Sequence, residues 1–504
     1  MVRIGPTRTL HTDQFSLSGF DGLLETLDER LGAVEIRGGE PGYEFVENAI
    51  FVPGAKVAAA DRGPGRFVTQ GALLASDGSP VSFAQARRRS FRWGAQVRGG
   101  IAESVDIAPV DELKGEVVYL GWFFTHFGHF LMESLTRTWF LDQVDPSVKV
   151  VFHRKTGAEP AGITSTILAA FGIPPERIVF LERPTRLRRV IVPEPLYELS
   201  YGAHEWMPRP FREVAARIVG DSSRLDQPVY LSRRLLPSGR RQIVGEFELE
   251  EALRENGFRI AHPETMTFSD QVRLVNQHSQ ILTSAGSASY NVFFALNEPT
   301  LHFMTAGIPR EDYFLSPAVA GAPSSYCNCL GLGGRPQLNT TPLLLDLPRI
   351  LEYLDASGFL NRRVAASIAA RAQGLQDDFN DAWLYSMIQD IPGGDTLAPE
   401  FAREAVAQSP QSWPLSWALA QYYVARDPAA VEQQVAQFIA LLPGERSVSK
   451  CVLHHRDIAA SAARILRRCS GATAEQLTRL LADRLSIDLE AEPRRGRRGD
   501  RANA

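Results

Sequence analysis

The chain has 504 residues, a hydrophobic content of 44% and a formal net charge of −4. This length and apolar content suffice for more than one buried core, so we expect a globular protein of two to four domains. The small negative charge provides no basic field that would attract nucleic acid. The only dense basic run lies in the C-terminal residues 493–504, which we expect to be a disordered, solvated tail.

Hydropathy and cysteine content bear on the compartment. The first residues contain no apolar segment of signal-peptide length, and no window approaches the roughly eighteen uncharged apolar residues of a membrane helix. The four cysteines (Cys327, Cys329, Cys451 and Cys469) are too few for a disulfide framework. We therefore expect reduced thiols, no transmembrane segment and a cytoplasmic location.

Residues 1–112 form the first predicted region. Short apolar runs such as AIFVPGAKVAAA and GRFVTQGALLAS alternate with Gly, Pro and SDGSP turn sequences, a pattern typical of short β-strands. We predict a β-rich N-terminal region, whose function the pattern does not indicate.

Two successive sets of alternating strands and helices follow, at 113–222 and 223–350. The first contains the strands VVYLGWFF, VKVVFH, RIVFL and RVIVPEP, a helix at about 129–142, and helices at TSTILAAF and PFREVAARIV. After a polar break, the second contains the strands PVYLSRR, FRIAHPE, QILTSAG and PTLHFM and the helices EFELEEALRENGF, FSDQVRLVNQH and SASYNVFFAL. Such alternation predicts an α/β fold with two Rossmann-like domains facing a cleft.

From about residue 351 to 492 the strand signals stop. Helical patterns rich in Ala, Leu and Arg take their place, and WPLSWALAQYYVARDPAAVEQQVAQFIALLP resembles one helix pair of a repeat protein. We predict a helical appendage, which is a candidate surface for a protein partner.

The stretch GWFFTHFGHFLMESLTR places polar residues in an apolar surrounding. If a helix begins near Gly128, then His129, Glu133 and Arg137 share one face, directly after a strand whose carboxyl end would border the cleft. A histidine and a carboxylate there suit general base catalysis, and the arginine could hold the carboxylate or a substrate.

Two other interpretations of this stretch stay open. Glu133 and Arg137 at spacing i,i+4 are also typical of an ordinary surface ion pair, with His129 a half-buried helix residue. His126, His129 and Glu133 have the residue types of a metal site, but the HExxH arrangement is absent and Gly128 weakens the case for helical geometry at His126.

A second constellation follows the strand of the second set. That strand ends at Ser232 and Arg233, and a loop with Pro and Gly brings Arg240 and Arg241 back before a helix. Guanidinium groups make bidentate contacts with phosphate oxygens, so these arginines favour a pyrophosphate ligand. A solvated basic loop is the alternative.

The run ILTSAGSASYN turns from a strand into a helix at Gly286 and Ser287. Small residues there let a ligand approach the backbone, and the N–H groups of a helix start favour an anion. Ordinary turn chemistry is the alternative. The run matches neither GxGxxG, nor the P-loop, nor GxSxG, so it favours neither a dinucleotide site nor Ser287 as a nucleophile.

Five motifs together resemble a known family. HFGHFLMESLTRTW, YLSRR with GRR, a glutamate-led helix, PETMTFSDQVRLV and GSASYNVFFA occur in the order and approximate spacing of glycosyltransferase family 61, over about residues 115–310. The sequence looks most like the bacterial branch, whose members are often described as capsular-polysaccharide-type proteins. The resemblance implies a GT-B fold, with an acceptor-side domain at 113–222 and a nucleotide-sugar domain at 223–350.

The resemblance also implies an inverting reaction, in which a base deprotonates an acceptor hydroxyl that attacks the anomeric carbon. It places the family's histidine at His129, its acidic residue at Glu133 and its arginine at Arg137. We slightly favour Glu133 as the base, because His129 could equally orient the acceptor. Arg137 and His126 are predicted to have acceptor or orienting roles. The donor-binding residues that the resemblance implies are Ser232, Arg233, Arg240 or Arg241, Glu246 and Asn291. Glu264, Gly286 and Ser287 complete the predicted donor-binding set.

The sequence departs from the family pattern at two positions. Gly245 stands where the family has an asparagine, and Ala285 stands where many members have a histidine. The contacts that those two family residues make are therefore in doubt here.

These observations predict a glycosyltransferase, hexosyl or pentosyl, with a nucleotide-sugar donor and a surface or capsular glycan acceptor. No DxD motif occurs in either α/β set and arginines are plentiful, so we expect a metal-independent reaction without a cofactor. The alternative is a non-catalytic scaffold that binds nucleotide or glycan in a polysaccharide assembly. A dinucleotide-dependent oxidoreductase is disfavoured by the missing glycine fingerprint.

Overall fold

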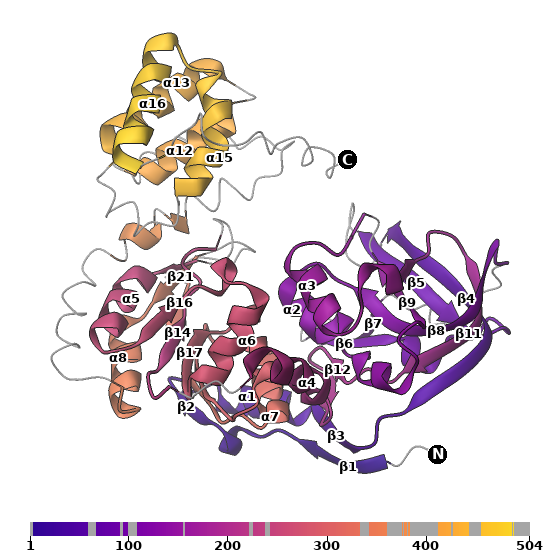
Figure 1. The fold of residues 1–504 in the computed structure, drawn as a ribbon. Coiled ribbons are helices and arrows are strands. Elements are labelled where there is room, and N and C mark those ends of the chain that lie inside the picture. Colours follow the sequence, from indigo (N-terminus) through magenta and orange to yellow (C-terminus); the bar gives the residue numbers. More distant parts are fainter. Residues whose placement is uncertain are drawn as a thin grey trace. The chain divides into compact units, whose positions relative to one another are not determined.

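The computed structural model describes residues 4–58, 67–90, 94–98, 108–154, 157–220, 225–236, 242–332, 342–359, 375, 377–380, 382–383, 412–424, 427–442, 455–485 and 487. The chain divides into two compact units. Figure 1 labels their helices and strands. Unit 1 comprises Met1–Leu231 and Thr265–Asn328, and unit 2 comprises Ser232–Glu264 and Cys329–Ala504. The fold is mixed α/β with several parallel sheets, which confirms the predicted fold class at that level.

The first large sheet of unit 1 is built from the predicted strands of the first α/β set. Its order is β10–β9–β8–β11–β4–β5, and the strands from β10 to β11 run parallel. β4 and β5 extend the sheet in antiparallel pairs, so part of the β-rich N-terminal region belongs to it. The strands are β8 (Asp111–Phe123), β9 (Lys149–Arg154), β10 (Ile178–Phe180), β11 (Thr185–Pro193), β4 (Tyr43–Ala58) and β5 (Phe67–Leu74).

The second large sheet of unit 1 is parallel throughout the order β14–β17–β18–β19–β2. Most of its residues are buried, as expected for strands that are covered on both faces. The strands are β14 (Val229–Leu231), β17 (Gln280–Ser284), β18 (Thr300–Met304), β19 (Ser324–Cys327) and β2 (Ser16–Ser18). A smaller sheet joins β1 (Ile4–Thr9), β3 (Glu35–Gly39), β13 (Gly202–His204) and β12 (Tyr197–Glu198).

One hydrophobic core joins these sheets with the helices of unit 1. It contains Phe152 on β9, Phe303 on β18 and Phe211 on α4, and the rings of Phe211 and Phe294 lie 5.0 Å apart. Both large sheets contribute side chains to this core. The loops at the carboxyl ends of their parallel strands therefore belong to the same compact unit. The helices are α1 (Leu24–Gly32), α3 (Ile163–Ala170), α4 (Pro208–Val219), α6 (Phe268–Gln277) and α7 (Asp312–Ala320).

Unit 2 contains a small sheet and several helices. The sheet has the order β15–β21–β20, and α5 (Glu246–Glu255) begins directly after β15. The remaining elements are β15 (Ile243–Val244), β21 (Leu343–Leu345), β20 (Leu330–Gly331), β16 (Arg259–Ala261), α8 (Leu347–Ala356), α12 (Trp413–Tyr423), α13 (Pro428–Leu441), α15 (His455–Leu466) and α16 (Gly471–Leu485).

The C-terminal helices pack around Trp417. Its indole Nε1 donates a hydrogen bond of 3.0 Å to Ser461 Oγ on α15, and its ring lies 4.6 Å from that of Phe438 on α13. This part of the chain is therefore helical where the structure describes it. None of the described helices is both long and apolar enough to cross a membrane.

A buried histidine gives unit 1 a pH-dependent stability. His153 Nε2 donates to the Val52 carbonyl at 2.8 Å, and its Nδ1 lies 2.7 Å from the Tyr119 hydroxyl. Burial lowers the pKa of His153 from 6.5 to about 4. The unfolded chain therefore binds more protons between pH 6.5 and about 4, and this histidine should cost about 3 kcal/mol of unfolding free energy as the pH falls through that window.

Urea unfolding at several pH values checks this expectation. His153→Gln should show a shallower loss of stability between pH 6.5 and 4 than the wild-type chain. Equal slopes for the two proteins would mean that His153 titrates alike in the folded and unfolded states.

Candidate functional site

The segment after β8 does not form the predicted continuous helix at 129–142. It comprises a short helix α2 (Phe127–His129), a π-helical turn η4 (Phe130–Ser134) and a 3-10 helix η5 (Thr138–Gln143). Two carbonyls that a helix would use are diverted: the Thr136 carbonyl accepts from Leu196 N at 3.0 Å, and the Leu135 carbonyl accepts from Thr138 Oγ1 at 2.7 Å. Competing side-chain and tertiary hydrogen bonds thus end the helix.

The π-helical turn brings His129 and Glu133 together. His129 Nδ1 lies 2.5 Å from Glu133 Oε2, and the two side chains are 30% and 10% exposed. The His126 ring stands edge-on to that of His129, with the centroids 5.3 Å apart. The carboxylate engages Nδ1 and leaves Nε2 as the other ring nitrogen, the arrangement in which a carboxylate orients a histidine base.

Arg137 lies in the interior rather than on an open face. It is 2% exposed, its Nε donates to the Pro193 carbonyl at 3.1 Å, and its Nη2 donates to the Phe83 carbonyl at 2.6 Å. A Cβ atom at Gly121, whose φ is +90°, would collide with Arg137 Nη1. The guanidinium therefore ties the segment that carries the His129–Glu133 pair to β11 and to the loop at Phe83.

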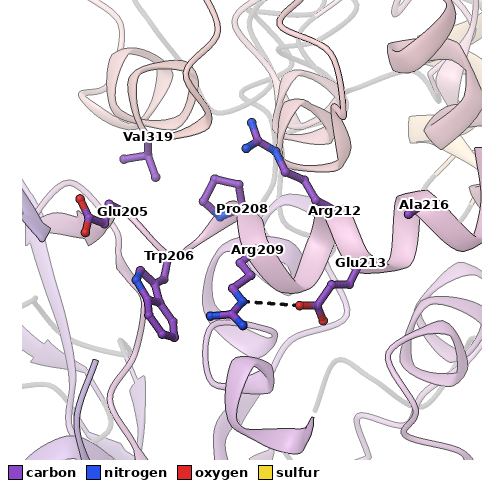
Figure 2. Close-up of a pocket in the computed structure, with 8 residues that line it drawn as sticks. All are labelled: Glu205, Trp206, Pro208, Arg209, Arg212, Glu213, Ala216 and Val319. Atoms are coloured by element: carbon purple, nitrogen blue, oxygen red, sulfur yellow. Dashed lines mark ion pairs between the residues drawn. The ribbon is translucent and has the colours of Figure 1, made fainter. Parts of the chain in front are cut away.

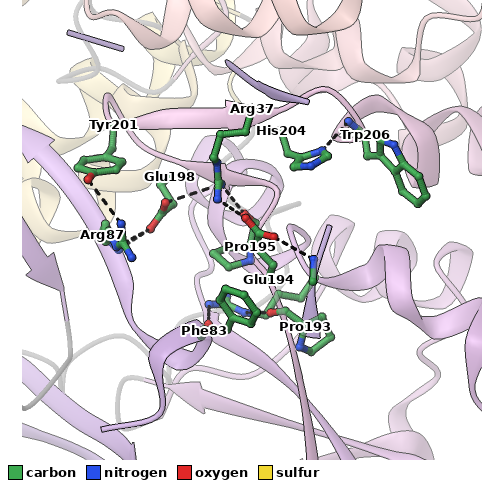
Figure 3. Close-up of polar contacts among 12 residues, drawn as sticks. Arg37, Phe83, Arg87, Pro193, Glu194, Pro195, Glu198, Tyr201, His204 and Trp206 are labelled. Carbon is green, nitrogen blue, oxygen red and sulfur yellow. Dashed lines mark hydrogen bonds and ion pairs between the residues drawn. The ribbon is translucent and has the colours of Figure 1, made fainter. Parts of the chain in front are cut away.

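Two buried carboxylates, Glu194 and Glu198, lie near this arginine, and Figure 3 shows the contacts that they make with other residues. Glu194 pairs with Arg37 and accepts from Gly42 N at 2.9 Å, while Glu198 lies 3.9 Å from both Arg37 Nη2 and Arg87 Nε. Burial raises the pKa of Glu198, although the arginine charges oppose that shift. This network is well suited to fixing the backbone around 193–198.

The structure brings the first motif against the turn at Gly286 and Ser287. A Cβ atom at Gly128 would lie 2.6 Å from Ser287 Oγ and 3.3 Å from Tyr290 Cε2. Both motifs follow the carboxyl ends of parallel strands, β8 and β17, and both belong to unit 1. His129, the residue after Gly128, is therefore held beside the turn at Gly286 and Ser287, which was predicted to bind an anion.

Gly128→Ala should disturb this contact. The added methyl group would overlap the Ser287 side chain, so we expect a loss of about 1–3 kcal/mol in unfolding free energy and displacement of His129. Urea unfolding measures the first effect, and kcat for sugar transfer measures the second. Gly471→Ala is the control, because a Cβ atom there meets nothing within 4 Å. If Ser287→Gly does not relieve the defect of Gly128→Ala, crowding at this contact is not its cause.

The turn itself leads into the 3-10 helix η8 (Ser287–Phe294). Ser289 Oγ donates to the Gly286 carbonyl at 2.8 Å, which closes the first turn of η8. Asn291 is buried and its Nδ2 donates to Gln271 Oε1 on α6 at 3.0 Å. Asn291 therefore joins η8 to α6, and a donor contact by this residue stays a prediction.

Ser232 and Glu246 meet in a polar cluster of unit 2. Ser232 Oγ donates to Glu250 Oε1 at 2.7 Å and lies 3.1 Å from Glu246 Oε1, which also accepts from Arg233 N at 2.9 Å. Arg234 Nε lies 3.1 Å from Glu250 Oε1. The buried glutamates thus hold the Ser-Arg-Arg turn, and Ser232 is bonded inside the protein.

The other predicted donor-side residues are less informative. Arg240 and Arg241 lie outside the described residues. Glu264 is exposed in a 3-10 turn at Pro263–Thr265. Glu250 was not among the residues predicted from the sequence, although its i,i+4 spacing from Glu246 places both carboxylates on one face of α5.

A metal site needs several His, Cys, Asp or Glu side chains close together. Among the described residues, no group of three or more such side chains is arranged to hold a metal ion.

Comparison with known proteins finds a family that part of the chain resembles. No curated protein matches the chain. The family model for glycosyltransferase 61 matches residues 127–302. The matched range begins in α2, beside the His129–Glu133 pair, and ends in β18, so it includes both the contact at Ser287 and the Ser232 cluster. This part of the chain, residues 127–302, is therefore similar to the glycosyltransferase 61 family.

Proposed function

We propose that this protein is an inverting glycosyltransferase that transfers a sugar from a nucleotide-sugar donor to a hydroxyl group of a glycan acceptor. The observation that carries the proposal is the His129–Glu133 pair, at 2.5 Å, held against the Ser287 turn inside the segment that matches the family. General acid–base chemistry needs such an oriented, partly exposed base.

In this proposal His129 Nε2 is the base and Glu133 the residue that orients it. Nε2 takes the proton of the acceptor hydroxyl, whose oxygen forms a bond to the anomeric carbon on the face opposite the leaving group. The bond from that carbon to the diphosphate oxygen breaks, and the nucleoside diphosphate leaves with the electron pair. Glu133 was slightly favoured as the base from the sequence, whereas the contact of its carboxylate with Nδ1 favours His129.

The residues predicted to bind the donor lie in both units, and each group is proposed separately. Gly286 and Ser287 start η8, where backbone N–H groups favour an anion. Arg233 follows Ser232 in the turn held by Glu246, and Arg240 and Arg241 would add positive charge to neutralise the departing diphosphate. Arginine in this role needs no divalent metal.

The finer assignments are part of the same proposal. We propose a GT-B-like pair of Rossmann-like domains at 113–222 and 223–350, flanked by the N-terminal region 1–112 and the helical appendage 351–492. The resemblance to the bacterial branch favours a capsular or other surface polysaccharide as the product, made in the cytoplasm. The helical appendage is the proposed surface for a protein partner.

Thermal unfolding with a panel of nucleoside diphosphates and sugar nucleotides tests the donor class. A ligand that binds only the folded state, at a concentration about 100 times its Kd, adds about 2.7 kcal/mol to the unfolding free energy. We therefore expect one nucleotide to raise Tm selectively. Arg233→Ala should lose the shift, while Arg349→Ala, at a half-exposed arginine of α8, should keep it. A chelator should change nothing.

Other outcomes would contradict parts of the proposal. A shift that depends on a divalent metal would reject the metal-free diphosphate site. The absence of any shift, across all nucleotides, would favour the scaffold interpretation over a transferase.

A further inference from the structure

Unit 1 has an open cavity that contains none of the predicted site residues. Its volume is about 590 Å³, within the range of small-molecule sites, and Figure 2 shows the side chains around it. Trp206, Pro208, Arg209 and Glu213 come from the start of α4 and the segment before it, and Val319 comes from α7. The cavity is therefore formed by elements that pack on the core of unit 1.

Trp206 provides an aromatic platform in this cavity. The indole is partly buried and stands edge-on to Trp139, with the ring centroids 6.3 Å apart. The guanidinium of Arg209 lies 4.6 Å from the centroid of the Trp206 ring. The face of an indole is the negative part of the ring quadrupole, so it attracts the partly positive C–H groups of a sugar ring as well as a cation.

The lining of the cavity has as many positively charged as negatively charged side chains. Its lining has two arginines, Arg209 and Arg212, and two glutamates, Glu205 and Glu213. Arg212 is already engaged, because it donates to the Ala295 carbonyl at 2.9 Å and the Ala320 carbonyl at 2.7 Å. A nucleoside diphosphate would therefore find no surplus of positive charge here, whereas a neutral polyhydroxyl ligand would meet both donors and acceptors.

Two of these side chains are accessible to such a ligand. Arg209 Nε lies 3.6 Å from Glu213 Oε1, and the side chains are 55% and 50% exposed. An exposed pair of this kind contributes little to folding, so its groups are free to exchange partners with sugar hydroxyls at small cost. The pair sits on one side of the indole, as Figure 2 shows.

A ring contact links the cavity to the segment that carries the proposed base. Trp139, which contacts Trp206, belongs to η5, six residues after Glu133 in the chain. From these observations we infer that the cavity is a subsite for a neutral stretch of the acceptor glycan, with Trp206 as the stacking platform and Arg209 and Glu213 as hydroxyl-binding groups. The inference rests on the proposed function for the identity of the acceptor.

Calorimetric titration with neutral oligosaccharides tests the subsite in the full-length chain. The probes are maltohexaose, cellohexaose, laminarihexaose and chitohexaose. At least one should bind saturably, and Trp206→Ala should weaken its binding at least tenfold. Glu213→Gln should weaken it severalfold, and because that side chain is half exposed, folding is not at risk. Glu25→Gln, at an exposed position of α1, should leave the binding unchanged.

Three results would overturn the subsite: no saturable binding of any probe, binding that survives both Trp206→Ala and Glu213→Gln, or displacement of the bound oligosaccharide by a nucleoside diphosphate. The nucleotide-induced rise in Tm is measured on the same proteins. If that rise is present but Trp206→Ala leaves oligosaccharide binding unchanged, the transferase proposal stands and the subsite fails. If no nucleotide raises Tm but Trp206→Ala abolishes oligosaccharide binding, the subsite stands and the transferase proposal fails.

Discussion

Glu133→Gln and His129→Gln should each lower kcat for sugar transfer by about 10²- to 10⁴-fold while the affinity for the nucleotide stays nearly unchanged. His129→Gln removes the nitrogen that accepts the proton. Glu133→Gln replaces the carboxylate that faces His129 Nδ1 at 2.5 Å, so the imidazole loses the partner that orients it and stabilises its protonated form. Steady-state kinetics with the donor found by thermal unfolding, together with nucleotide titration, measure both quantities.

The two variants also separate the candidate bases. If His129 is the base, His129→Gln should be at least as damaging as Glu133→Gln. If Glu133 takes the proton directly, His129→Gln should keep substantial turnover. Glu176→Gln serves as the matched control, since that side chain is exposed and belongs to a 3-10 turn before β10. Full activity in Glu133→Gln would remove this pair from the mechanism.

The parallel strands could be predicted from sequence because their signal is local. Runs such as VVYLGWFF and QILTSAG are apolar and short, and they lie in β8 and β17 as expected. The alternation of these strands with α3, α4 and α6 could be predicted for the same reason, because each helix has its own periodic apolar face. The polar residues at the carboxyl ends of these strands followed from the same pattern.

The geometry of the candidate site depended on contacts that no local pattern contains. The Thr136 carbonyl is taken by Leu196, sixty residues later, and this bond helps to end the predicted helix. Gly128 weakened the case for a helix in the sequence, whereas in the structure it admits the Ser287 side chain. The face predicted to hold His129, Glu133 and Arg137 together is therefore divided: the first two meet, and Arg137 turns inward.

Arg137→Met should lower the unfolding free energy by about 3 kcal/mol or more, which is among the largest effects expected for a single substitution in this chain. Methionine keeps much of the apolar stem but offers no donor to the Phe83 and Pro193 carbonyls, which the guanidinium now satisfies. It also removes a buried cation near Glu194 and Glu198. Urea unfolding measures the loss, and Arg137→Lys should recover only part of it, because an ammonium group cannot span both carbonyls as a planar guanidinium does.

Arg189→Met is the matched control for this experiment. Arg189 is 55% exposed and pairs with Glu116 across neighbouring strands at 3.1 Å, so its replacement should cost less than about 1 kcal/mol. The alternative role for Arg137, contact with the acceptor, predicts a different pattern: an increased KM for the acceptor with normal stability. A variant that unfolds at the wild-type urea concentration but binds acceptor poorly would therefore assign Arg137 to the substrate. A destabilised variant that loses kcat would assign it to positioning the His129–Glu133 pair through the backbone.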